Sequence, residues 1–98
     1  ALADLYYVPV APHTPGGPIC TAAAMHLAAA IPNFLILEQM EPQRALRDRM
    51  SSVPIRFDDG HFLLPEGPGL GIEPNLEALQ EFAFRPQPRT ERAGPLYR

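Results

Sequence analysis

Cysteine and lysine are the residues that this chain most clearly lacks. Its 98 residues include one cysteine, Cys20, which excludes an internal disulfide and fits a reducing, cytoplasmic compartment. All eight basic residues are arginines, spread from Arg44 to Arg98 among acidic residues, and the net charge is −3. A nucleic-acid binder normally carries a basic face that neutralises several phosphates. The sequence has no such face, so we expect no nucleic-acid partner.

Long apolar runs are also scarce. The best candidate, residues 21–37, is interrupted by His26, Pro32 and Asn33. It is also shorter than the roughly 20 residues that a bilayer requires. A helix followed by a strand explains this run better, and we expect no membrane partner. No basic stretch followed by an apolar one opens the chain, so we also expect no signal peptide.

Thirteen prolines divide the chain into short elements. Residues 1–6 predict the end of a helix, and residues 19–31 predict an alanine-rich helix that is apolar nearly all round. Residues 9–11 and 34–37 are apolar without polar alternation, which is typical of parallel strands buried on both faces. The order is helix, strand, loop, helix, strand, and its last four members form a βαβ unit. The α/β fold therefore needs neighbouring strands that this chain does not supply; a self-sufficient α+β domain is the alternative.

The character of the sequence changes after Pro42. Residues 42–52 are polar and predict a loop with some helical turn. Within residues 53–64, Asp58-Asp59-Gly60 separates two apolar runs and predicts a β-hairpin. Asn75 predicts the N-cap of a short helix that ends near Phe82.

His13 and Glu38 are the candidate catalytic residues. Each stands at or just past the carboxyl end of a predicted parallel strand, which in (β/α)-barrels is the edge that carries the active site. Adjacent strands lie about 4.8 Å apart, so both side chains can face one pocket. A histidine there can move protons near neutral pH, and a carboxyl group can hydrogen-bond a substrate oxygen. The alternative is a surface histidine and a capping or ion-paired glutamate, and position alone does not decide between them.

Other candidates favour structural roles. We expect His26 to be a helix-packing residue and Cys20 to be a small buried one, since neither has a catalytic partner nearby in sequence. The three histidines and the cysteine lack zinc-type spacing. The loop at residues 15–18 contains two prolines that cannot donate to an anion, so we interpret it as a turn. Asp58-Asp59 offers too few oxygens for calcium.

Several motifs in series resemble the enolase superfamily, in particular galactonate-dehydratase-like members of its mandelate racemase subgroup. The resemblance covers most of residues 5–80 and rests on Val10-Ala11-Pro12-His13-Thr14-Pro15, Gly17-Pro18-Ile19, Ile31-Pro32-Asn33, Leu37-Glu38-Gln39 and Pro65-Glu66-Gly67-Pro68-Gly69-Leu70-Gly71-Ile72. It implies that residues 1–41 end a (β/α)-barrel domain with its last βαβ unit. Residues 42–98 would then be a C-terminal segment with a hairpin, a short helix and an extended tail, packed on the barrel or its cap.

The resemblance also implies an activity. His13 matches a seventh-strand histidine that acts as general acid or base, and Glu38 matches an eighth-strand glutamate that hydrogen-bonds the enolate oxygens. The implied parent is a Mg²⁺-dependent sugar-acid dehydratase, with the metal ligands on strands absent from this chain. A racemase or epimerase of the same superfamily and a non-catalytic fragment that completes a barrel are the alternatives. The expected partners are the sugar acid, the rest of the barrel and an N-terminal capping domain, in a homo-oligomeric parent.

Overall fold

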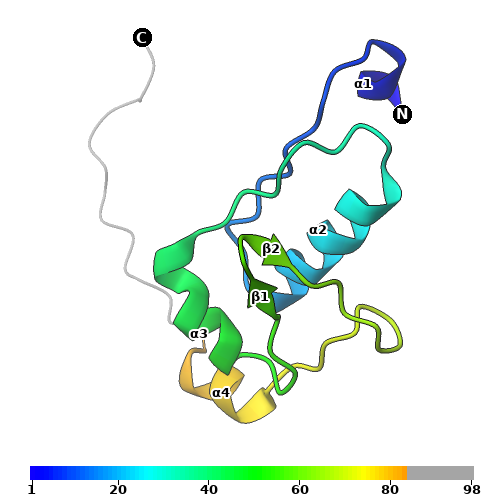
Figure 1. Ribbon diagram of the computed structural model, residues 1–98. Helices are drawn as coiled ribbons and strands as arrows, with labels where there is room; N and C mark the ends of the chain where they lie inside the picture. The colour runs from blue at the N-terminus through cyan, green and yellow to red at the C-terminus, as the bar shows by residue number, and fades with distance from the viewer. Residues whose placement is uncertain (84–98) are drawn as a thin grey trace, which may run out of the picture.

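The computed structural model describes residues 1–83 (Figure 1). The predicted tail at residues 85–98 lies outside these described residues. In chain order the elements are α1 (Leu2–Leu5), α2 (Pro18–Ala30), the 3₁₀ turn η1 (Glu41–Gln43), α3 (Arg44–Arg49), β1 (Phe57–Asp58), β2 (His61–Phe62) and α4 (Leu76–Glu81). Figure 1 shows the β1–β2 hairpin beside α2, with α3 and α4 together at one end of the molecule.

Helix α2 is the longest element and matches its predicted position to within one residue. Pro18 occupies its first turn, where the missing N–H of proline costs no hydrogen bond. Ile31 leaves the helical conformation at the other end, immediately before Pro32. Proline disfavours helical conformation in the preceding residue, so the sequence itself ends the helix there.

The two predicted strands lie side by side and parallel, but they pair only briefly. Val10 and Phe34 form a parallel bridge, in which Val10 donates to the carbonyl of Asn33 at 2.8 Å and accepts from Leu35 at 2.9 Å. Leu35 and Ile36 are 64% and 63% exposed, as expected of strands that need neighbours beyond those in this chain. Within residues 1–83 no further strand pairs with this bridge. The parallel order of the βαβ unit is thus confirmed, while its apolar faces remain open.

Residues 42–52 are more helical than predicted. Their polarity favoured a loop, but α3 occupies Arg44–Arg49, where alanine, leucine and arginine all have good helix propensity. Arg47 is buried, and its guanidinium lies 5.7 Å from the ring centroid of Phe62. Arg44 lies at the same distance over Phe57. Stacking against the hairpin therefore stabilises a helix that sequence polarity alone did not reveal.

The hairpin forms at the predicted turn, with a shorter ladder than its two apolar runs indicated. Phe57 pairs with Phe62 and Asp58 with His61, so Asp59 and Gly60 make a two-residue turn. Both turn residues have positive φ, 41° and 80°, as in a type I′ turn. The rings of the phenylalanine pair meet edge to face, 5.1 Å apart.

A small core joins α2 to the second half of the chain. It comprises Ala22, Met25 and Ile55, with partly buried Leu37, Phe62, Leu70 and Ile72 around it. His26 adds a polar link, with Nε2 lying 3.2 Å from the carbonyl oxygen of Leu70. The prediction of a packing histidine is confirmed. Asn75 caps α4 as predicted, since its side-chain oxygen accepts the backbone N–H of Ala78 at 3.2 Å.

Gly71 provides a test of this packing. Its φ is +69°, and an added Cβ would overlap Pro65, whereas Gly69 has a similar φ of +65° and open space around it. Gly69→Ala should therefore lose about 1–2 kcal/mol of unfolding free energy from backbone strain alone. Gly71→Ala should lose about 1–3 kcal/mol more from overpacking. Urea unfolding of both variants, made in the enzyme that contains residues 1–98, checks this, and equal losses would mean that the contact with Pro65 is unimportant.

Candidate functional site

His13 and Glu38 meet where the parallel segments end. Nδ1 of His13 lies 2.5 Å from Oε2 of Glu38, although the two residues are 25 apart in sequence. Both side chains are accessible, at 66% and 53% exposed. The prediction that they lie together is confirmed, and their catalytic role stays a prediction.

The backbone brings this pair together. His13 follows Val10 by a few residues, and Glu38 follows Phe34 in the same way. The parallel bridge between Val10 and Phe34 therefore places both His13 and Glu38 at the carboxyl end of the paired segments. Glu38 donates its backbone N–H to the carbonyl of Pro12 at 3.2 Å. Thr14, which is buried, donates its hydroxyl to the Glu38 carbonyl at 2.6 Å. Sequence reasoning missed Thr14; the one available signal was a hydroxyl residue directly after the candidate histidine.

An imidazole against a carboxylate can do two kinds of chemistry. The histidine can accept or donate a proton, with the carboxylate holding the ring in place. The glutamate has a second oxygen that can interact with a substrate. Because both groups are accessible at the carboxyl ends of parallel segments, they stand where α/β folds bind their ligands.

Cys20 and the remaining candidates do not join this pair. Cys20 was expected to be buried, but it is exposed among the described residues. Asp58 and Asp59 belong to the hairpin and its turn. Among residues 1–83 no cluster of three or more histidine, cysteine, aspartate or glutamate side chains could hold a metal ion. The described residues therefore do not fit a Mg²⁺ site.

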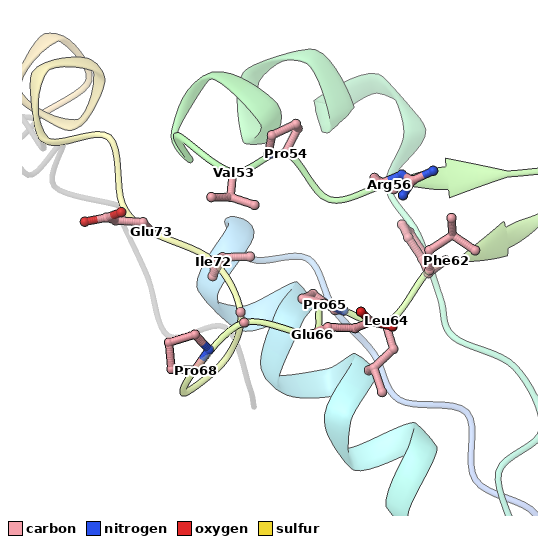
Figure 2. Close-up of a pocket in the computed structure, with 13 residues that line it drawn as sticks. Val53, Pro54, Arg56, Phe62, Leu64, Pro65, Glu66, Pro68, Ile72 and Glu73 are labelled. Atoms are coloured by element: carbon pink, nitrogen blue, oxygen red, sulfur yellow. The ribbon is translucent and has the colours of Figure 1, made fainter.

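Two cavities lie away from the pair. One, of about 990 Å³, opens between the hairpin strands and residues 65–73, and Figure 2 shows Arg56, Glu66 and Glu73 among its mostly apolar lining. The other, of about 800 Å³, lies between α2, residues 34–37 and the hairpin, and includes Gln39. Neither His13 nor Glu38 lines them. In the described part of the chain no helix is long and apolar enough to cross a membrane.

Comparison with known proteins defines the family. The family model described as Enolase C-terminal domain-like matches residues 1–79. The chain therefore belongs to this family, whose domain is the (β/α)-barrel part of the enolase superfamily.

Its relatives include sugar-acid dehydratases. The chain is 42% identical over 79 residues to the D-xylonate dehydratase of Haloferax volcanii, covering 81% of this chain and 19% of that protein. It is 40% identical over 86 residues to the D-galactonate dehydratase family member RspA of Halomonas elongata, covering 86% and 21%. A structure described as a mandelate racemase/muconate lactonizing enzyme, from Burkholderia SAR-1, superposes with a TM-score of 0.77 at 36% identity, covering 82% and 20%. The chain thus spans about a fifth of the length of the relatives it matches.

Proposed function

We propose that residues 1–98 form the C-terminal part of a barrel enzyme that dehydrates sugar acids. The observation that carries this proposal is the 2.5 Å contact between His13 and Glu38 at the carboxyl ends of two parallel segments. The dehydratases among the relatives support the choice of reaction. The remainder of the barrel and a capping domain would come from polypeptide outside these 98 residues.

The reaction would proceed in two steps. Removal of the proton on the carbon next to the carboxylate leaves an electron pair that is shared with the carboxylate as an enediolate. That pair then forms a carbon–carbon double bond as the neighbouring hydroxyl departs and is protonated to water, and the resulting enol tautomerises to a ketone. His13 would take the first proton or protonate the departing hydroxyl. Glu38, when protonated, would donate a hydrogen bond to the enediolate oxygen.

Mg²⁺ is the cofactor that the family resemblance implies. Since no described cluster of this chain fits the ion, its ligands would lie on other strands of the barrel. When bound there, it would stabilise negative charge on the substrate carboxylate. None of the roles given to His13 and Glu38 depends on a contact between this chain and the metal.

A racemase or epimerase is the second candidate, favoured by the structural similarity to the mandelate racemase/muconate lactonizing enzyme. Such an enzyme would make the same enediolate and return the proton to the opposite face. A fragment that completes a barrel without taking part in catalysis is the non-enzymatic alternative.

Proton NMR in D₂O separates these functions. A panel of sugar acids, incubated with the enzyme that contains residues 1–98 and with Mg²⁺, should yield a 2-keto-3-deoxy acid from at least one member. Deuterium at carbon 2 with inverted configuration and no keto product would favour the racemase instead. If no member of the panel gives either product, the proposed reaction has no support.

A further inference from the structure

Three consecutive residues at the end of the first segment bind three different groups of Glu38. The carbonyl of Pro12 accepts its backbone N–H at 3.2 Å, and His13 contacts its carboxylate at 2.5 Å. The hydroxyl of Thr14 donates to its backbone carbonyl at 2.6 Å. The main chain and the side chain of Glu38 are thus both fixed by one short stretch of sequence.

The register of the parallel pair shifts just before this point. Val10 and Pro12 accept from Leu35 and Glu38 respectively, so the acceptors are two residues apart while the donors are three apart. A regular parallel pair keeps a spacing of two on both sides. The second segment therefore contains one extra residue, as in a β-bulge, which bends a strand and redirects the side chains that follow. Here it places the carboxylate of Glu38 against the imidazole of His13.

The shifted register leaves the Glu38 carbonyl dependent on a side chain. No backbone N–H among the described residues bonds the Glu38 carbonyl, and the Thr14 hydroxyl takes that place. Thr14 is only 5% exposed, so water cannot readily replace it as a donor.

We infer that Thr14 is a positioning residue, whose buried hydroxyl holds the bulged end of the second segment and so aligns Glu38 with His13. The inference rests on the proposed function and extends it to a residue that does not itself carry a proton. Without this hydrogen bond, the segment would be free to return to the regular register, which turns alternate side chains to the opposite face.

Thr14→Val tests the inference in the enzyme that contains residues 1–98. Valine keeps the branched shape but removes the donor, so kcat should fall about 10- to 100-fold as the pair loses alignment. KM should change less than about threefold, because a side chain that is only 5% exposed offers little surface to a substrate. Thr14→Ser keeps the hydroxyl and should stay within about threefold of wild-type kcat. Wild-type kcat in Thr14→Val, or equal damage from serine and valine, would overturn the positioning role.

Coupling to Glu38 separates positioning from general structural support. On a Glu38→Ala background, where no carboxyl group remains to be aligned, Thr14→Val should cost less than about threefold further, because its effect acts through Glu38. If the double variant loses kcat by the product of the two separate reductions, the inference is overturned. If His13→Asn abolishes turnover while Thr14→Val keeps it, the positioning role of Thr14 is rejected and the proposed function stands. If His13→Asn leaves turnover unchanged, the proposed function and this inference fail together.

Discussion

His13→Asn in the enzyme that contains residues 1–98 should lower kcat by about 10²- to 10⁴-fold, the usual contribution of a general acid or base. Asparagine keeps the polarity and approximate size of histidine but cannot carry a proton near neutral pH. The side chain is 66% exposed, and within residues 1–83 it hydrogen-bonds only to Glu38. The fold and Mg²⁺ binding should therefore survive, and steady-state kinetics with a thermal melt separates lost chemistry from lost structure.

His61→Asn is the matched control for this substitution. His61 is also an exposed histidine whose Nδ1 makes one hydrogen bond, at 2.8 Å to the carbonyl of Asp59 in the hairpin turn. It lines the cavity beside α2, which neither His13 nor Glu38 lines, and its hydrogen bond is to the hairpin turn. The same chemical change there should leave kcat within about twofold. An equal loss in both variants would show that the effect of His13→Asn is not specific to the site.

Glu38→Gln should lower kcat less than His13→Asn. An amide can still donate a hydrogen bond to a substrate oxygen, although it has no negative charge to place beside the imidazole. Glutamine also keeps the two backbone hydrogen bonds of residue 38, to Pro12 and Thr14, because these involve the main chain. The order of the two losses therefore distinguishes a proton carrier from a hydrogen-bond donor.

Residues 1–98 on their own should show no cooperative thermal transition and no dehydration activity, with or without Mg²⁺. Within residues 1–83 the buried apolar residues are few: Ala22, Ala24, Met25, Ile55 and Ala78. Large apolar side chains on both sides of the βαβ unit are exposed, among them Leu27, Leu35 and Ile36. Each such side chain contributes about 1.5–3 kcal/mol only when it is fully buried. An open parallel sheet of two short segments therefore cannot offset the entropy of folding.

Calorimetry and amide exchange of dilute monomer check this expectation. The matched comparison is the same chain mixed with a polypeptide that supplies the rest of the barrel, where a cooperative transition and protected amides in α2 should appear. A cooperative transition in the isolated monomer would show that the small core around Met25 is sufficient, and that the exposed faces need no partner.

The sequence predicted the elements whose signals are local. Helix α2 follows from Pro18, an alanine-rich interior and Pro32. The hairpin turn follows from an aspartate and a glycine that accept positive φ, and the cap of α4 follows from Asn75. In each case a few adjacent residues decide the backbone conformation, so no knowledge of distant contacts is required.

Features that depend on distant contacts were missed or only partly predicted. Helix α3 is stabilised by arginines stacked on Phe57 and Phe62, which lie more than ten residues away in the sequence. Cys20 looked like a core residue because its helix is apolar all round, but the described chain covers only part of that helix.

The same division holds for the candidate site. The end positions of two parallel segments predicted that His13 and Glu38 would meet. The bulge before Glu38 and the hydrogen bond from the Thr14 hydroxyl could not be predicted, because they depend on which backbone carbonyls lack an N–H partner after the strands align.

The most direct test of the account follows product formation and hydrogen exchange at carbon 2 in one sample in D₂O. Wild type, His13→Asn and His61→Asn would be compared by proton NMR with a sugar acid that the wild type dehydrates. We predict that His13→Asn loses product formation about 100-fold or more while His61→Asn matches the wild type. Exchange should also stop if His13 removes the first proton, and it should persist if His13 only protonates the departing hydroxyl. If His13→Asn forms product and exchanges hydrogen at wild-type rates, the account is contradicted. The contact between His13 and Glu38 would then be an ordinary surface ion pair.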